Sequence, residues 1–446
     1  MAEIKRILVA NRGEIALRAI RTIKEMGKEA VAVYSTADKG SEYLKLADAS
    51  ICIGDGPSAK SYLNIPAIIA AAEISHCDAI FPGYGFLSEN QHFVEICTHH
   101  HIKFIGPTPE VMVLMSDKSK AKDVMIAAGV PVVPGSDGAI HDIEDAKKRA
   151  KEVGYPVILK AAQGGGGRGM RVVEEESRLE NLFLAAESEA ITSFGDGTIY
   201  MEKFILNPRH IEVQIMADAH GNVVHVGERD CSMQRRHQKL IEESPANILT
   251  PEVRAKIHAS AVQATKFIKY EGAGTFEFLL DKNLDFYFME MNTRLQVEHT
   301  VSEEVSGLDL IEMMIRVAEG EKLPSQESIS FSGHSIECRI SAEDSVKFLP
   351  SPGKITSWIA PGGRGIRIDT HVHAGYTVPP TYDSMIGKLI VYGNDRADAI
   401  AKMYRALSEF KVEGIKTTID FHKKMMTNPD FKSNNFDTKY LENYKG

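Results

Sequence analysis

The chain has 446 residues, of which 43% are hydrophobic, so it can bury a large core and is expected to form roughly two to four domains. A formal net charge of −9 argues against a nucleic-acid-binding protein, so any basic surface must be local. The apolar run 7–10 is too short for a signal peptide, and no run reaches the ~20 residues of a membrane span. Five widely spaced cysteines without a C-x-x-C pair predict a reducing, cytoplasmic setting without disulfides or structural zinc: Cys52, Cys77, Cys97, Cys231 and Cys338.

The first ~115 residues alternate strand-like and helix-like stretches, which predicts a parallel sheet. Strands are expected at 6–10 and 30–34, with a helix at about 13–26 between them. Asn11 is a candidate cap for this helix. The turn after the first strand lacks the G-x-G-x-x-G pattern of a dinucleotide site. The buried stripe of the helix is expected to contain Ile15, Ala19, Ile20 and Ile23.

A glycine-rich loop follows the apolar strand 79–81 and reads Pro82-Gly83-Tyr84-Gly85-Phe86. Parallel sheets tend to bind ligands at the carboxyl ends of their strands, where this loop would lie. Loops of this kind are common, so the pattern alone leaves open whether this one binds anything. The run His99-His100-His101 precedes an apolar stretch and is interpreted as a helix end before a strand, in preference to a metal site.

A second glycine-rich loop, 164–169, follows a strand that ends at Lys160 and comes after a proline-rich hinge at 130–135. Its glycines satisfy G-x-G-x-x-G, but the strand-like run 170–173 follows in place of the helix that a dinucleotide site requires. A loop between two strands can instead cover nucleotide phosphates with its backbone N–H groups, and Lys160 would add positive charge. A flexible surface hairpin is the alternative, but it does not explain the entropic cost of four successive glycines.

Two further strands are expected in the middle of the chain. The stretch 198–205 carries Glu202 and Lys203 near its end and either presents backbone groups to an adenine edge or is an ordinary strand. The stretch 210–218 alternates polar and apolar residues as an antiparallel strand should, and 220–222 would form its turn.

The stretch 229–239 is densely basic in an otherwise acidic protein. It lacks the interleaved aromatic residues of a nucleic-acid patch, so a pocket for small anions is the sharper interpretation. Cys231 lies beside Asp230 at a helix-like start. An activated thiol is possible there, but we expect an unreactive buried cysteine.

A hairpin is expected from 272–280 and 285–291, and it can bring Glu277 opposite Glu290. Carboxylates on adjacent strands repel, so a cation between them is the simplest explanation, and an oxygen set with Asn292 suits Mg²⁺ or Mn²⁺ better than zinc. If the strand continued, alternate residues would form one polar row about 26 Å long. This row is either an edge strand that faces solvent or a binding surface that holds a cation at one end and an anion at the other. That row consists of Glu290, Asn292, Arg294, Gln296 and Glu298.

The last ~115 residues are expected to form a separate unit. Its predicted elements are an alternating strand at 333–340, a turn at 350–353, a loop leading to a strand at 382–390, a helix at 396–410 and a closing segment at 414–424.

A set of residues and motifs occurs along the chain in this order: Lys118, Lys160 with the loop 164–170, Glu202-Lys203, His237-Gln238-Lys239, Glu277, Glu290-Met291-Asn292 and the run 294–298. Taken together, this set resembles the biotin carboxylase family of ATP-grasp enzymes. The likeness covers essentially the whole chain, including 10–16, 81–90, 135–138 and 382–389. It implies an α/β and α+β fold with three domains. These are a Rossmann-like N-terminal domain at 1–115, an ATP-grasp domain at 116–330 with a mobile lid at about 132–204, and an α+β C-terminal domain at 331–446.

The resemblance also implies a reaction. In this family ATP and bicarbonate give carboxyphosphate, and the CO₂ that it releases carboxylates N1 of biotin on another protein. This chain would be the biotin carboxylase subunit of an acetyl-CoA carboxylase or of a two-subunit pyruvate carboxylase. The expected partners are a biotin carboxyl carrier protein, a carboxyltransferase subunit and a second copy in a homodimer, with no nucleic acid and no membrane.

The site residues carry over by motif. The resemblance assigns catalysis to Glu298 as the base, with Arg294, Arg339 and Lys239. Bicarbonate would be held by Lys239, Arg294, Gln296, Val297 and Glu298, and biotin by Tyr84, Gly85 and Arg339. Two Mg²⁺ or Mn²⁺ ions would be bound by Glu277, Glu290 and Asn292. ATP would be bound by Lys118, Lys160, Gly164, Gly165, Gly166, Gly167, Gly169, Met170, Glu202, Lys203, His210, Gln234, His237, Glu277 and Glu290.

This assignment is chemically reasonable. Bicarbonate is a poor electrophile, so it must first be phosphorylated by MgATP, and a metal ion with lysines can neutralise the charge that develops on the transferred phosphoryl group. For one carboxyphosphate to meet both ends of the polar row, the backbone must leave the strand soon after Asn292. Another ATP-grasp ligase would share the metal residues without needing the run 294–298 or Arg339, and a non-catalytic ATP-binding regulator should lack a base such as Glu298.

The sequence departs from the family pattern in two places. Thr300 stands where the family usually has proline, which is expected to loosen the turn that follows Glu298. The chain also lacks the Ala-Met-Lys-Met biotinylation motif, so the carrier is expected to be a separate protein.

Overall fold

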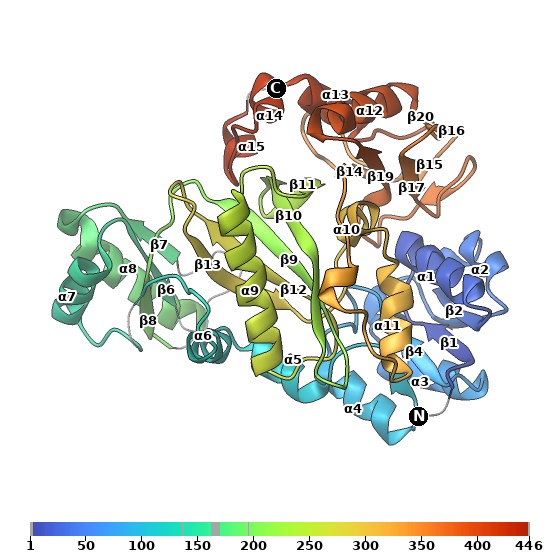
Figure 1. The fold of residues 1–446 in the computed structure, drawn as a ribbon, viewed down its shortest axis with the longest axis horizontal. Coiled ribbons are helices and arrows are strands. Elements are labelled where there is room, and N and C mark those ends of the chain that lie inside the picture. The colour runs from blue at the N-terminus through green and yellow to red at the C-terminus, as the bar shows by residue number, and fades with distance from the viewer. Residues whose placement is uncertain (1–2, 136–137, 162–169, 195, 445–446) are drawn as a thin grey trace. The chain divides into compact units, whose positions relative to one another are not determined.

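The computed structural model describes residues 3–135, 138–161, 170–194 and 196–444. Two compact units are present: Met1–Val130 with Arg209–Phe278 and Glu290–Gly446, and Pro131–Pro208 with Leu279–Met289 (Figure 1). Glycines 164–167 and 169 lie outside the described residues.

The N-terminal region forms the predicted parallel sheet. Its strands run in the order β3-β2-β1-β4-β5, and each strand is parallel to its neighbours. Helix α4 (Gln91–His99) ends at the histidine run, directly before β5, as expected. The strands are β1 (Arg6–Val9), β2 (Glu29–Ser35), β3 (Ala49–Gly54), β4 (Ala79–Phe81) and β5 (Lys103–Phe104), and the other helices are α1 (Gly13–Glu25), α2 (Tyr43–Leu46), α3 (Ile65–Ile74), α5 (Pro109–Ser116) and α6 (Lys118–Ala127).

Helix α1 packs as predicted but is capped differently. Ile15, Ala19, Ile20 and Ile23 are all buried. The N-cap position is Arg12, without a capping side chain, so the prediction for Asn11 was wrong. The Asn11 amide instead donates two hydrogen bonds of 2.8 Å, to the carbonyls of Pro82 and Tyr84. Asn11 therefore ties the start of α1 to the glycine-rich loop after β4.

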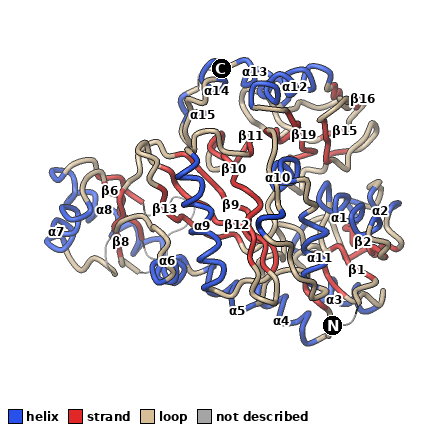
Figure 2. The backbone as a smooth tube through the Cα atoms, viewed as in Figure 1, coloured by secondary structure: helices blue, strands red, loops and turns tan. Residues whose placement is uncertain are grey.

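An eight-stranded sheet carries several of the assigned site residues, and its strands run in the order β13-β12-β9-β10-β11-β14-β19-β17 (Figure 2). The predicted hairpin is present as β12 and β13, and β14 pairs with β11, so the C-terminal region continues this sheet. Every residue of β9 is buried, polar ones included, because this strand lies inside the sheet. The strands are β9 (Arg209–Ala217), β10 (Val223–Arg235), β11 (Gln238–Ser244), β12 (Gly272–Leu280), β13 (Phe286–Asn292), β14 (His334–Ser341), β17 (Ile366–Asp369) and β19 (Met385–Gly393).

The second unit has a three-stranded antiparallel sheet in the order β7-β6-β8. Its core contains Leu159, Phe183 and Met201. The chain resumes at Met170 as a strand, as expected for a glycine loop that joins two strands. The elements are β6 (Val157–Ala161), β7 (Met170–Val173), β8 (Ile199–Lys203), α7 (Ile143–Val153) and α8 (Glu176–Phe194).

The remaining elements of the first unit include the predicted helix at 396–410, observed as α12 (Arg396–Glu409). No helix in the described part of the chain is long and apolar enough to span a membrane. The other elements are α9 (Pro251–Phe267), α10 (His299–Ser306), α11 (Leu310–Ala318), α13 (Ile419–Thr427), α14 (Pro429–Lys432), α15 (Tyr440–Asn443) and the pairs β15 (Gly353–Lys354) with β18 (Thr377–Val378) and β16 (Ser357–Ile359) with β20 (Lys411–Glu413).

Candidate active site

A cavity of about 640 Å³ in the first unit collects residues from distant parts of the sequence. The start of α1, the loop after β4, strand β11, the bend after β13 and strand β14 all contribute to its wall. The fold thus brings together every residue that the sequence assigned to bicarbonate or biotin. These are Tyr84, Gly85, Lys239, Arg294, Gln296, Val297, Glu298 and Arg339.

The polar row does not continue as a straight strand. Strand β13 ends at Asn292, and Glu298 is already the N-cap residue of α10. The side chain of Leu295 is fully buried inside the bend. The edge-strand alternative was therefore wrong, and the departure of the backbone soon after Asn292 is confirmed.

Glu298 lies buried between two cations. Its Oε1 is 2.8 Å from Nζ of Lys239, and its Oε2 is 3.0 Å from a guanidinium nitrogen of Arg339. Burial by itself would raise the pKa of Glu298, but the charges of Lys239 and Arg339 outweigh it and hold the pKa below its usual value. The group is an ionised carboxylate at neutral pH and can accept a proton.

Lys239 is the shared cation of three carboxylates. It pairs with Glu212, with Glu298, and with Glu277 at 3.2 Å. Burial disfavours the charged amine, but these carboxylates, Glu212 first, raise the pKa of Lys239 well above its ordinary value. The positive charge of Lys239 is therefore retained at all physiological pH values.

Arg294 is aimed by a residue that the sequence reasoning did not assign. Its Nε donates to Oε2 of Glu89 at 2.8 Å, and a terminal nitrogen donates to Oδ1 of Asn292 at 3.1 Å. Glu89 also accepts a hydrogen bond from the backbone N–H of Thr293 at 3.0 Å. The only sequence signal for Glu89 was its place in the family-like segment 81–90.

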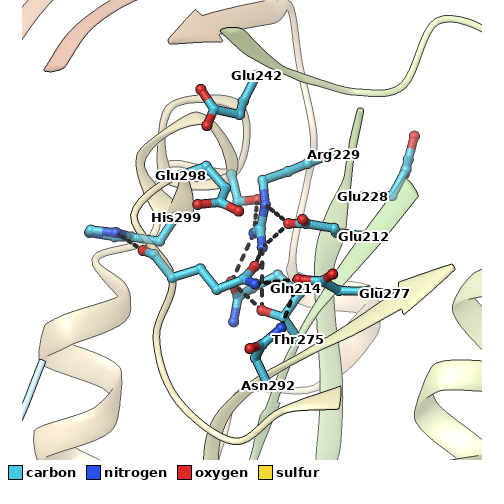
Figure 3. Close-up of polar contacts among 12 residues, drawn as sticks. Glu212, Gln214, Glu228, Arg229, Glu242, Thr275, Glu277, Asn292, Glu298 and His299 are labelled. Atoms are coloured by element: carbon cyan, nitrogen blue, oxygen red, sulfur yellow. Dashed lines mark hydrogen bonds and ion pairs between the residues drawn. The ribbon is translucent and has the colours of Figure 1, made fainter. Parts of the chain in front are cut away.

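Arg229 forms the centre of a buried polar network (Figure 3). It donates to Glu212 at 3.0 Å, Gln214 at 2.8 Å and Gln296 at 2.8 Å. The expectation that the whole stretch 229–239 forms an anion pocket was therefore wrong at this end, because Glu212 already neutralises Arg229. Sequence reasoning missed the role of Arg229 in fixing Gln296, since nothing local shows which carboxylate it meets.

Cys231 lies within strand β10, so the expected helix-like start is wrong. Its side chain is buried, as predicted. Burial raises the pKa of the Cys231 thiol well above its usual range, which removes the thiolate needed for reactivity.

The metal-assigned residues meet around Glu277. Its Oε1 accepts 2.7 Å hydrogen bonds from the amides of Asn292 and Gln296. Burial and the neighbouring charge of Glu277 raise the pKa of Glu290, and Nζ of Lys118 lies 4.0 Å from Glu290. Two carboxylates that repel each other suit a hard divalent cation, while the Asn292 amide turns its nitrogen towards Glu277 and its oxygen towards Arg294.

His210 adds a nitrogen beside this carboxylate pair. It lies 2.9 Å from Oε2 of Glu277 and 3.3 Å from Glu212. Burial would lower the pKa of His210, but Glu277 and Glu212 raise it to about 9. The potential ligand atoms of these three residues lie within 4.8 Å of one another.

The other nucleotide-assigned residues are distributed over both units. In the second unit Lys160 pairs with Glu202, Met170 lies opposite Lys160 in the sheet, and Lys203 donates at 2.8 Å to the carbonyls of Gly154 and Tyr155. In the first unit Gln234 pairs with Lys239 between β10 and β11, and the exposed His237 lies in the turn between these strands.

Thr300, which replaces the proline usual in the family, is fixed by a hydrogen bond of its own side chain. Thr300 is fully buried in the first turn of α10, and its hydroxyl donates to Oε2 of the buried Glu337. Where the sequence predicted a looser turn, the structure shows a hydrogen bond that proline cannot form.

Behind this turn lies a buried lysine that the sequence did not single out. Lys388 is fully buried, and its Nζ donates to the carbonyl of Val297 at 2.8 Å. It lies 3.4 Å from the carboxylate of Glu14. In the pairing of β14 with β19, Lys388 stands opposite Arg339. Lys388 on β19 therefore holds the backbone of Val297, and Arg339 on the neighbouring strand β14 holds the side chain of Glu298.

Comparisons with known proteins agree along the whole chain. Residues 3–112 match the family model for the biotin carboxylase N-terminal domain, 117–326 the carbamoyl-phosphate synthase L chain ATP-binding domain, and 337–443 the biotin carboxylase C-terminal domain. Biotin carboxylase from Nostoc sp. is 56% identical, covering 98% of both chains.

Two solved structures are similar over nearly the full length. The biotin carboxylase–β-γ-ATP complex from Campylobacter jejuni is 70% identical, with a TM-score of 0.93 and 99% coverage of both chains. The biotin carboxylase domain dimer of 2-oxoglutarate carboxylase from Hydrogenobacter thermophilus, in complex with MgADP, ADP and bicarbonate, is 48% identical, with a TM-score of 0.90 and coverage of 99% of this chain and 98% of that one. With its site geometry and full-length similarity, this chain belongs to the biotin carboxylase family of ATP-grasp ligases.

Proposed function

We propose that this chain carries out the ATP- and bicarbonate-dependent carboxylation of biotin on a separate carrier protein. Bicarbonate oxygen attacks the γ-phosphorus of ATP and ADP leaves. The resulting carboxyphosphate breaks down to phosphate and CO₂; the phosphate takes the proton from N1 of biotin, and the CO₂ bonds to that nitrogen. The observation that carries this proposal is the buried, ionised Glu298 between Lys239 and Arg339, in a cavity that Tyr84 and Gly85 also line.

Each cavity residue receives a role from its contacts. Glu298 takes the proton of bicarbonate, because it is ionised and buried beside the cations that would hold the anion. Lys239 and Arg294 supply positive charge to bicarbonate, with Gln296 and Val297 beside them. Arg339 is fixed by Glu242 and Glu298 and would stabilise the enolate oxygen of biotin. Tyr84, whose buried hydroxyl has no hydrogen-bond partner among the described residues, lines the cavity beside Gly85 and would border biotin.

The oxygen-rich group at the end of β13 fits one or two divalent cations. We assign Mg²⁺ or Mn²⁺ to Glu277, Glu290 and Asn292, because burial and, after it, the charge of Glu277 raise the pKa of Glu290, and a cation would relieve both effects. The bound metal would neutralise phosphate charge during transfer. Around it, Lys118 and His210 place further positive charge next to Glu290 and Glu277.

The proposed nucleotide residues belong to both units. Lys118, His210, Gln234, His237, Glu277 and Glu290 lie in the first, and Lys160, Met170, Glu202 and Lys203 lie in the second. We retain the division into domains 1–115, 116–330 with a lid at 132–204, and 331–446. The boundaries of the family matches, at 112 and 117 and at 326 and 337, support it.

The carrier and a carboxyltransferase are the proposed partners, and acetyl-CoA and pyruvate are the candidate final acceptors. A homodimer is supported by the dimeric domain of the Hydrogenobacter relative. Five free cysteines fit the proposed cytoplasmic location. Identification of the biotinylated protein that co-purifies with the chain would distinguish the two acceptors.

The reaction is tested by ATP hydrolysis in the presence of Mg²⁺. We expect ADP release to require bicarbonate and to rise when free biotin is added. A regulator that only binds ATP would not hydrolyse it, and another carboxylate ligase would depend on a different acid. Hydrolysis without any bicarbonate dependence would refute the proposed function.

A further inference from the structure

A second groove of about 550 Å³ lies next to the catalytic cavity in the first unit. Arg235 and Phe348 line both hollows. Residues outside the cavity, among them Arg236, Val346, Lys424 and Leu441, complete the groove. The groove, called here the basic groove, therefore shares part of its wall with the site where biotin is proposed to react.

The basic groove carries positive charge that the chain itself does not neutralise. Among the described residues, Arg235, Arg236 and Lys424 form no ion pair with any carboxylate. Arg235 stacks on the ring of Phe348, 4.6 Å from its centroid. In the part of the chain that the structure describes, one acidic residue, Glu442, lines the groove. Three free cations against one carboxylate stand out on a chain whose net charge is −9.

Apolar side chains are exposed beside these cations. Val346 lines the groove and is 73% exposed, and Leu349, on the other side of Phe348 in the sequence, is 59% exposed. Neither touches the catalytic cavity. Exposed apolar residues next to unpaired charges are typical of a protein-binding surface with an apolar centre and a charged rim.

We propose that the basic groove is the docking surface for the biotin carrier protein, which would meet it with a face of acidic and apolar side chains. The inference rests on the proposed function, because biotin bound covalently to a carrier can enter the cavity only if the carrier sits at its edge. Acidic residues of the carrier would pair with Arg236 and Lys424, and its apolar residues would cover Val346. Free biotin needs none of these contacts.

Two substitutions test this surface in the full-length enzyme without touching the cavity. We expect Lys424→Glu to raise the KM for a biotinylated carrier about fivefold, as expected for the loss of an exposed ion pair worth at most ~1 kcal/mol. Val346→Asp should raise it about tenfold, because it removes apolar contact and adds like charge. Stimulation of ATP hydrolysis by free biotin should stay unchanged in both variants. The substrates are biotinylated carrier domains of the acetyl-CoA carboxylase and pyruvate carboxylase types.

The chain offers a matched control for each substitution. Lys266 is an exposed lysine in the last turn of α9, as Lys424 is in the last turn of α13, so Lys266→Glu has the same effect on a helix end. Ile74 is 73% exposed, like Val346, so Ile74→Asp controls for the loss of an exposed apolar side chain. Neither control should change the KM for the carrier.

Three results would overturn the inference. An unchanged carrier KM in both groove variants would show that the carrier docks elsewhere. Dissociation of a homodimer by Lys424→Glu, seen by light scattering, would make the groove an interface between copies. If the unaltered enzyme used free biotin but neither carrier, the docking proposal would fail while the proposed chemistry stood, whereas loss of bicarbonate dependence would remove the proposed function itself.

Discussion

Replacement of Lys388 by methionine tests how the turn that carries Glu298 is held. Methionine keeps most of the buried volume but leaves the carbonyl of Val297 without the donor that now lies 2.8 Å away. Loss of a hydrogen bond to a charged partner costs about 2 kcal/mol. We also expect a kcat at least roughly tenfold lower, because the backbone next to the base is no longer fixed.

The loss of stability should depend on pH through Glu14. Burial raises the pKa of Glu14 to about 7, against the attraction of Lys388. Since this folded-state pKa lies above the unfolded one, Glu14 lowers stability as pH rises towards 7, and the effect is constant above it. Without Lys388 the pKa rises further, so from pH 7 to pH 8 the variant loses about 1.4 kcal/mol more than the unaltered chain.

Thermal unfolding at two pH values measures both parts. At about 2.1 cal/mol/K per residue, 446 residues give ~0.9 kcal/mol per degree, so Lys388→Met should lower the melting temperature by about 2 °C at pH 6 and by about 4 °C at pH 8. Lys402→Met is the control, because Lys402 forms a more exposed pair with Asp398 and should lose less than ~1 kcal/mol at either pH. Equal destabilisation by Lys388→Met at both pH values would refute the coupling to Glu14.

Three further variants test the site. Glu298→Gln should abolish bicarbonate-dependent ATP hydrolysis while calorimetry shows nearly unchanged ATP binding, because only the proton acceptor is lost; loss of ATP binding would mean that the base is misassigned. Glu89→Gln should raise the KM for bicarbonate about fivefold with little change in kcat, since the partner of Arg294 loses its charge, and an unchanged KM would show that Arg294 needs no such support. Thr300→Val should lower the free energy of unfolding by about 1–3 kcal/mol, because the buried Glu337 loses its hydrogen-bond donor. Thr300→Ser keeps the hydroxyl and should leave the free energy of unfolding unchanged. Equal losses in the two variants would contradict the role of the hydrogen bond.

Sequence reasoning found the elements whose signals are local. The βα alternation predicted the parallel sheet, and the turn 281–284 between two apolar strands predicted the hairpin β12–β13. The order of motifs along the chain predicted the family. These features depend on residues close together in the sequence, which share a helix face, a turn or a motif.

The same reasoning failed where a side chain chooses a distant partner. Asn11 has the right chemistry for a helix cap, but its amide binds the loop after β4. Arg229 belongs to a basic stretch, yet it is buried against Glu212 and fixes Gln296. Such choices follow from which polar groups become buried together, because a buried group must find its partner wherever the fold places one.

By itself, the sequence determined which side chains are present for chemistry: a carboxylate for the proposed base, cations to surround it and an oxygen-rich set for the proposed metal. Only the tertiary structure decided how they meet. The alternating row from Glu290 to Glu298 would be straight if the strand pattern alone controlled it, but the chain bends after Asn292 and buries Leu295. Glu89 and Lys388, far away in the sequence, then fix the two sides of that bend. Burial of one leucine and neutralisation of long-range charges, which no local pattern encodes, bring Glu298 between Lys239 and Arg339.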